Sequence, residues 1–233
     1  MSVRIERMWR SGLTAMLTVL LAGCSSSPPQ VGAGSGSPSP TVSDTPGPSA
    51  APSPSPSPSA TSWKYTFPVD GNPVSYHRTH SGYAATDIFA SCGSAVRAVT
   101  DGIVLEVSRV DRFDPANPDP ALKGGLFVSI KGDDGVRYYG AHLVEVAAGI
   151  EKGVRVRNGQ SVGAVGHTGN ASNICHLHFG ISPPCAGAAD WWIRRGVVWP
   201  WPYLDAWRAK APKSAATEVY QWHREHGCPE RAQ

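Results

Sequence analysis

The chain has 233 residues, of which 41% are hydrophobic and 17% are charged, and its formal net charge is +3. A chain of this length can bury one substantial core and holds one domain or at most two. Because the net charge is small and no lysine or arginine cluster falls on a segment that reads as a helix, nucleic acid is not expected as a partner.

The first 23 residues are typical of an export signal. Arginines precede an apolar run at 13–22. This run is too short to cross a bilayer, because a membrane-spanning helix needs about 20 residues. The run leads into Leu21-Ala22-Gly23-Cys24, which resembles the lipobox of bacterial lipoproteins. We therefore predict a signal peptide at 1–23, a lipidated Cys24, and an exported protein that faces the cell wall and meets the membrane only through its lipid anchor. An ordinary cysteine at this position is the alternative.

Residues 24–62 have the composition of a disordered tether. Between Ser25 and Ser62, 27 of 38 residues are proline, serine or glycine, which cannot form a packed core. One domain therefore remains, beginning at residue 63, and the tether would carry it away from the membrane.

The segment from residue 65 to residue 181 shows short apolar alternation broken by Gly, Asn and Asp, the pattern of antiparallel β-structure. The stretch at 110–125 holds three prolines and is predicted to be a loop, either one wall of a groove or an inserted surface loop. We expect seven strands, at residues 65–69, 95–99, 102–107, 126–130, 136–139, 161–165 and 174–181.

Residues 186–233 differ in character from the strands before them. Five tryptophans fall between positions 191 and 207, and helical patterns occur at 203–210 and 215–226. Aromatic side chains of this density can stack on sugar rings, but they more often seal an extension onto a sheet. We predict a short Trp-rich helical extension packed on the same domain.

Apart from Cys24, the chain has four cysteines, at positions 92, 175, 185 and 228. An even set in an exported domain predicts two disulfides, and three pairings are possible. We favour Cys175 with Cys185, because they bracket a short strand and a proline turn, which leaves Cys92 to pair with Cys228.

The tetrapeptide His176-Leu177-His178-Phe179 carries the strongest chemical signal. In a strand, residues two apart project from the same face, so His176 and His178 would point together while Leu177 and Phe179 enter the core. Two imidazoles on one face can bind one metal ion, or one can bind while the other moves protons.

Four motifs occur in order along the chain: His80 with Asp87, Tyr139-Gly140-Ala141-His142-Leu143, a glycine-rich segment at 159–170, and His176–Phe179. This series resembles the lysostaphin/LytM-type zinc metallopeptidases over about residues 69–181. The resemblance implies a mainly β fold, an antiparallel sheet with an open groove of the duplicated hybrid motif type. It also implies cleavage of peptide bonds in bacterial peptidoglycan by a catalytic domain at 63–185.

The resemblance assigns roles position by position. It implies that Asp87 and His178 are zinc ligands and that His142 and His176 are the catalytic, proton-handling residues. The chain departs from the family at one ligand, because the position four residues before the aspartate, normally histidine, is Tyr83 here.

We expect His80 to be the missing ligand, since Ser81-Gly82 can form a loop that returns it to Asp87. His77, ten residues before Asp87, is one alternative, and the absence of a third ligand is another. Tyr83 itself is a poor match, because catalytic zinc sites use nitrogen and carboxylate oxygen donors in this type of arrangement.

These residues fit a single chemistry. One zinc ion per chain, held by three ligands, would keep a position open for water and polarise the scissile carbonyl. His142 and His176 would act as base and acid, in an order that the residues leave open. The expected substrate is a peptidoglycan peptide and the expected state is a monomer. The alternative is an inactive LytM-like module that binds wall peptide or activates another cell-wall hydrolase.

Overall fold

The computed structural model describes residues 62–187 and 189–230. The predicted signal peptide, the lipidated Cys24 and all but the end of the tether lie outside the described residues. Within those residues, no helix has the length and apolar character needed to span a membrane.

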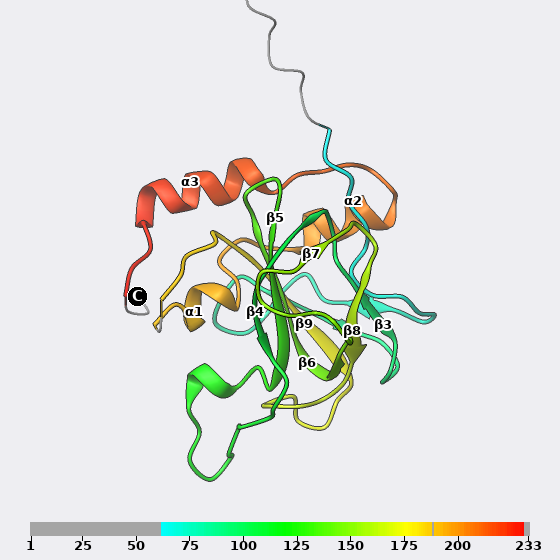
Figure 1. The fold of residues 1–233 in the computed structure, drawn as a ribbon, viewed down its shortest axis with the longest axis vertical. Helices are drawn as coiled ribbons and strands as arrows, with labels where there is room; N and C mark the ends of the chain where they lie inside the picture. Colours follow the sequence, from blue (N-terminus) through cyan, green and yellow to red (C-terminus); the bar gives the residue numbers. More distant parts are fainter. Residues whose placement is uncertain (1–61, 188, 231–233) are drawn as a thin grey trace, which may run out of the picture. The chain divides into compact units, whose positions relative to one another are not determined.

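The centre of the fold is an antiparallel sheet that contains all nine strands of the described residues (Figure 1). Its main path runs β1-β2-β9-β6-β5-β4-β7; β8 joins this path by pairing with β6, and β3 pairs with β8. The strands are β1 (Ser75–Tyr76), β2 (Thr86–Phe89), β3 (Ala95–Arg97), β4 (Gly102–Ser108), β5 (Leu126–Gly132), β6 (Arg137–Val146), β7 (Arg155–Val156), β8 (Ser161–Val165) and β9 (His176–Ser182).

Strand β9 lies between β2 and β6, and every residue of it is buried. Leu177, Phe179 and Ile181 point into the main hydrophobic core. Because side chains alternate along a strand, His176 and His178 share the opposite face. A central strand therefore presents both histidines from a rigid support.

The predicted strands are present, most of them with shifted ends, except for the first. Within residues 65–69, only Val69 takes part in strand pairing, through a single bridge to Val96. The patterns also missed β1, β2 and β7, which have two to four residues each. Such short segments have too few alternations to stand out, and long-range pairing stabilises them.

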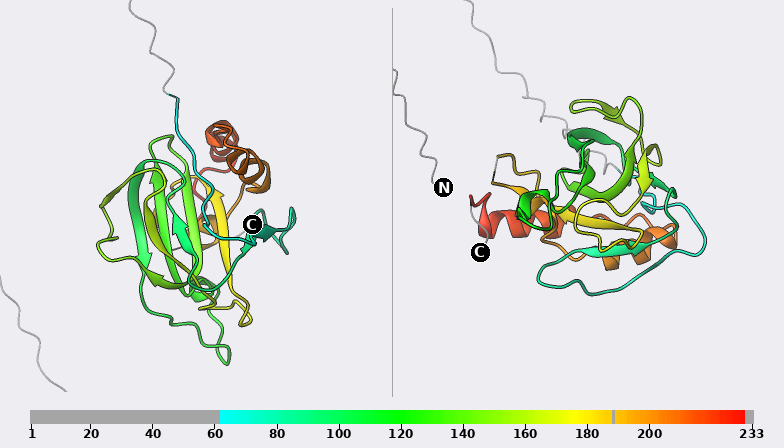
Figure 2. Two further views of the ribbon diagram at one scale, coloured as in Figure 1. Left: turned by 90° about the vertical axis from the view of Figure 1, so that its right-hand side faces the viewer. Right: turned by 90° about the horizontal axis from the view of Figure 1, so that it is seen from below.

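Three α-helices follow the sheet within the described residues: α1 (Trp191–Arg194), α2 (Trp201–Arg208) and α3 (Ala216–His226). Figure 2 shows α2 and α3 on the same side of the sheet. Trp207 of α2 is 2% exposed, stacks on Tyr65 and packs edge-on against Tyr138 and Phe179. This tryptophan therefore seals the extension onto the sheet, as predicted, whereas Trp191 lines a cavity described below.

The predicted disulfide pairing is wrong. The bonds join Cys92 to Cys175 and Cys185 to Cys228. Strand β9 separates Cys175 from Cys185, and at about 3.3 Å per residue it holds them too far apart for a disulfide, whose Cα atoms lie within about 7 Å. Antiparallel pairing of β2 with β9 instead places Phe89 opposite His176. Cys92 and Cys175 therefore both lie just beyond this end of the strand pair.

Candidate metal centre and catalytic cleft

Pairing between β2 and β9 brings two predicted ligands together. Asp87 is the register partner of His178, and its Oδ1 lies 2.9 Å from His178 Nδ1. His80 comes from the loop before β2, and its Nε2 lies 3.8 Å from Asp87 Oδ2. One ligand atom from each of the three residues lies within 4.8 Å of the other two.

The spacing of this trio fits zinc. Bonds of about 2.0 Å in a tetrahedron place neighbouring ligand atoms about 3.3 Å apart, and the two distances above bracket that value. His178 Nε2 lies 2.9 Å from the carbonyl oxygen of Arg195. Because a carbonyl only accepts, this nitrogen carries the hydrogen, and Nδ1 keeps the lone pair that a metal ion would bind.

The types of donor group support the same assignment. Two imidazoles and one carboxylate form one of the donor sets that catalytic zinc sites use.

The structure brings His80, and not His77, to this cluster. His77 is exposed, and its ring packs edge-on against Phe89. The loop after His80 includes Gly82 at φ +87°, a left-handed conformation that glycine adopts readily. This turn returns the chain toward Asp87.

Tyr83 lies beside the cluster without offering a charged ligand. Its ring centroid is 4.4 Å from that of His80 and 5.9 Å from that of His178. Burial raises the pKa of Tyr83 to about 12, so the phenol stays protonated at neutral pH.

The carboxylate of Asp87 is ionised. Burial by itself would raise the pKa of Asp87, but the close contact with His178 and the nearby imidazoles of His176 and His80 lower it to about 2. A negative ligand is therefore available at every pH at which the protein would work.

His142 occupies a strained position next to the trio. It lies on β6 at φ +64°, which is uncommon for a residue other than glycine and costs about 1–3 kcal/mol. Its Nδ1 lies 2.8 Å from the carbonyl oxygen of Thr168, so Nδ1–H donates and Nε2 is left with its lone pair. Thr168 is itself held, because its hydroxyl donates to the carbonyl of Leu143 and accepts from the amide of Leu126.

His176 is oriented in the same way. Its Nδ1 lies 2.8 Å from the carbonyl oxygen of Ile174, and its Nε2 lies 3.9 Å from Asp87 Oδ1. The ring centroids of His142 and His176 are 4.8 Å apart. Burial, and then the neighbouring His178 and His176, lower the pKa of His142 to about 3, so this imidazole is neutral near pH 7.

One cleft of about 510 Å³ is lined by the candidate ligands, by Tyr83 and by the two other histidines: His80, Tyr83, Asp87, His142, His176 and His178. Pro120, Ala121, Lys123 and Gly124 also line it, so the loop at 110–125 forms part of a groove wall. Three further residues that line the cleft, Trp191, Arg194 and Arg195, were not predicted from the sequence as part of the site. The only sequence signal for them is the compact Trp-Trp-Ile-Arg-Arg segment that they belong to.

A second group of metal-ligating residue types, Cys185, His223 and Cys228, also lies close together. Its two cysteines form a disulfide, so they offer no thiolate. The candidate metal centre among the described residues is therefore the one built by His80, Asp87 and His178.

Comparison with known proteins agrees with this geometry. Residues 79–188 match the model of peptidase family M23. The chain is 32% identical over 144 residues to the L-Ala–D-Glu endopeptidase of Bacillus subtilis (strain 168). That alignment covers 59% of this chain and 38% of the relative, so the chain matches well under half of that protein's length. Residues 79–188 of the chain thus form an M23 peptidase domain.

Two solved structures are also similar. A candidate LytM glycyl-glycine endopeptidase from Ruminococcus gnavus is 24% identical, with 65% of this chain and 63% of that chain covered and a TM-score of 0.48. The catalytic domain of lysostaphin from Staphylococcus simulans is 22% identical, with 61% and 89% covered and a TM-score of 0.42.

Proposed function

We propose that the chain is a zinc-dependent endopeptidase that hydrolyses peptide bonds in bacterial peptidoglycan. One observation carries this proposal: the trio of His80, Asp87 and His178 shares a cleft with two imidazoles, His142 and His176, whose unprotonated Nε2 atoms are left free by hydrogen bonds at Nδ1. A structural ion-pair network would not need two further histidines oriented in this way.

In the proposed site, His80, Asp87 and His178 hold one zinc ion. When bound, this ion supplies Lewis acidity toward the scissile carbonyl and toward water. The Nε2–H of His178 donates to the carbonyl of Arg195, which fixes the ring so that Nδ1 faces Asp87.

The two other histidines move protons. In the proposed reaction, the neutral Nε2 of one histidine accepts a proton from the attacking water, and this proton then passes through the histidine pair to the leaving amine. The carbonyls of Thr168 and Ile174 accept the Nδ1–H of His142 and His176, which keeps each ring in place during transfer. Both imidazoles face the same cleft, so a peptide bond there can reach both.

The M23 domain implies a substrate in the cell wall, and the name of the Bacillus relative suggests which bond to test first. We propose the bond between L-Ala and D-Glu as that first candidate. We also propose that the export signal at 1–23 and the lipid on Cys24 keep the protein on the membrane surface, and that 24–62 lets the catalytic domain reach the wall as a monomer.

The proposal is tested by measuring zinc content and peptide release with the purified full chain. We expect about one zinc per chain and release of new amino termini from peptidoglycan, and both should vanish with a strong chelator. Zinc near one per chain without any cleavage of peptidoglycan or of L-Ala–D-Glu peptides would contradict the enzyme proposal and favour an inactive wall-binding module.

A further inference from the structure

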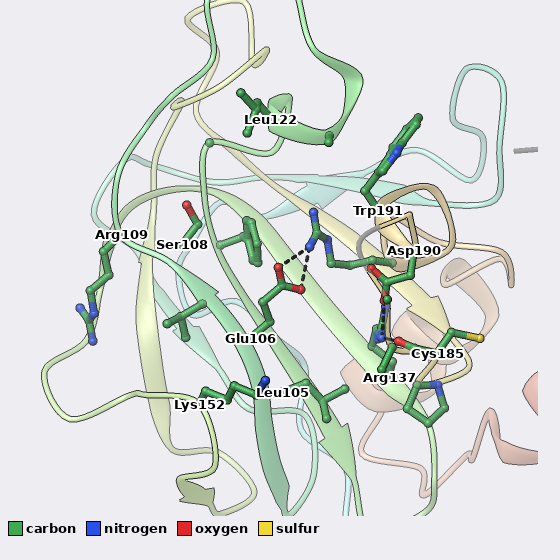
Figure 3. Close-up of a pocket in the computed structure, with 18 of the residues that line it drawn as sticks. Leu105, Glu106, Ser108, Arg109, Leu122, Arg137, Lys152, Cys185, Asp190 and Trp191 are labelled. Carbon is green, nitrogen blue, oxygen red and sulfur yellow. Dashed lines mark hydrogen bonds and ion pairs between the residues drawn. The ribbon is translucent and has the colours of Figure 1, made fainter. Parts of the chain in front are cut away.

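Two arginines beside the cleft have acidic partners. Arg194 Nη1 lies 2.6 Å from both carboxylate oxygens of Glu106, and Arg137 Nη2 lies 2.8 Å from Asp190 Oδ2. Figure 3 shows Glu106, Arg137 and Asp190 in a neighbouring cavity of about 700 Å³, with the ion pairs as dashed lines. The charges of these two guanidinium groups are therefore already compensated.

Arg195 differs from both. Among the described residues it has no acidic side chain within ion-pair distance, and its buried Nε has no hydrogen-bond partner. Its guanidinium carbon lies 3.9 Å from the ring centroid of Tyr83 and 5.1 Å from that of Trp191. These cation–π contacts hold the group at one place in the cleft without neutralising it.

The balance of charge in the cleft favours an anionic occupant. Its basic residues are Lys123, Arg194 and Arg195, and its one acidic residue is Asp87. Asp87 belongs to the proposed metal ligands, and Arg194 is paired with Glu106. Among the described residues of the cleft, Arg195 is therefore the side chain that is held in place and carries a positive charge without an acidic partner.

We propose that Arg195 is a carboxylate-binding residue of the cleft, and that it selects wall peptides with a free carboxylate close to the bond that is cut. The planar guanidinium fork binds a carboxylate through two parallel hydrogen bonds, which a neutral amide cannot reproduce. This inference rests on the proposed peptidase function, because it names a property of that enzyme's substrate.

The position of the guanidinium suits this role. The Tyr83 ring is close to both the guanidinium and the candidate metal centre, with its centroid 3.9 Å from the guanidinium carbon and 5.9 Å from the ring centroid of His178. The separation between Arg195 and the His178 ring therefore cannot exceed the length of about three extended residues. A peptide whose scissile bond lies at the metal centre can place a carboxylate of a neighbouring residue on Arg195.

The test compares two synthetic peptides that contain L-Ala–D-Glu. In one peptide the D-Glu carboxylate that does not continue the peptide chain is free, and in the other it is converted to an amide. Dissociation constants are measured by calorimetry on the zinc-depleted full chain, where cleavage does not interfere. Rates, as kcat/KM, are measured on the zinc-loaded full chain. We expect the wild-type chain to prefer the free carboxylate about 10- to 100-fold in both measurements.

Three variants identify the residue responsible. Arg195→Gln should bring the preference close to one, and Arg195→Lys, which keeps the charge without the fork, should give an intermediate value. The substitution leaves the backbone carbonyl that accepts from His178, and zinc content reports whether the site is intact. Arg112→Gln removes an exposed arginine that lines the neighbouring cavity, and it should leave the preference unchanged.

The outcomes separate the two proposals. A wild-type preference near one, or a preference that survives in Arg195→Gln, overturns the role of Arg195. If the zinc-loaded chain cleaves neither these peptides nor peptidoglycan, but the binding preference is present and is lost in Arg195→Gln, the peptidase proposal fails and the carboxylate site stands.

Discussion

At the scale of single residues, the proposed metal site depends on one unusual ligand. His80 lies seven residues before Asp87, and a loop through Gly82 returns it to within 3.8 Å of the carboxylate. The exposed His77 lies in the same segment and packs on Phe89 instead. The two histidines therefore form a matched pair for testing which one binds the metal.

We predict that His80→Ala loses zinc and activity together, because both depend on the same ligand set. His77→Ala should keep both. Zinc content is measured by atomic absorption after dialysis, beside a peptide-release assay. If His77→Ala lost the metal and His80→Ala kept it, the ligand assignment would have to be reversed.

His142 and His176 should affect activity without affecting metal content. Each Nδ1 is held by a backbone carbonyl, and neither ring belongs to the ligand trio. We predict that His142→Ala and His176→Ala each lower kcat by about 100- to 10,000-fold, the usual contribution of a general acid or base, and retain about one zinc per chain. His167→Ala, at an exposed histidine on the glycine-rich segment at 159–170, serves as the control and should keep full activity.

At the scale of elements, the site depends on the contact between β2 and β9. Their register places Asp87 opposite His178, and the Cys92–Cys175 disulfide ties the chain just beyond the Phe89–His176 end of this pair. The second disulfide, Cys185–Cys228, ties the chain after β9 to the chain after α3, away from the ligands. The two bonds therefore stabilise the same fold but differ in their relation to the metal site.

Removing either disulfide by paired alanine substitutions should lower the free energy of unfolding by about 4 kcal/mol, because they close long loops, with 83 and 43 residues of sequence separation. Only the Cys92/Cys175 pair should also weaken zinc binding. Urea unfolding and zinc titration with a competing chelator measure the two effects. Zinc affinity that is unchanged in the Cys92/Cys175 variant, or lowered equally in both variants, would contradict a specific link between this disulfide and the metal site.

At the scale of the whole molecule, a buried cluster joins distant parts of the chain. The hydroxyls of Tyr65 and Tyr138 donate to the same carboxylate oxygen of Asp134, at 2.8 and 2.6 Å, and Tyr65 stacks on Trp207 of α2. The cluster links the residues before the sheet, the β5–β6 turn and the C-terminal extension. Burial raises the pKa of both tyrosines well above 10, and the charge of Asp134 raises it further.

This cluster predicts a loss of stability in alkali. A group whose pKa is raised on folding contributes stability that is fully present below its unfolded pKa, about 10 for tyrosine, and is lost as the pH rises toward the folded value. The free energy of unfolding should therefore fall steadily above pH 10. Replacing both Tyr65 and Tyr138 by phenylalanine should make the free energy of unfolding depend less steeply on pH, as measured by urea unfolding from pH 8 to pH 11. An unchanged slope in the double variant would mean that the cluster does not cause the alkaline loss.

Local patterns in the sequence determined much of the chemistry. The alternation of β9 put His176 and His178 on one face because a strand repeats every two residues, and this required no knowledge of the rest of the fold. The order of the motifs indicated the family, which the match over residues 79–188 bears out. The mainly antiparallel architecture and the helical extension were likewise readable from periodicity and turn residues.

Tertiary structure decided whatever depends on pairing between distant segments. The short strand β2 has no pattern of its own, yet its register with β9 sets which histidine reaches Asp87 and which cysteines meet. Arg195 was also invisible in the sequence, since its environment comes from Tyr83 and from the segment after β9. Local spacing constrains neighbours along the chain, whereas contacts between residues about 100 positions apart arise only when the sheet assembles and its strands choose their partners.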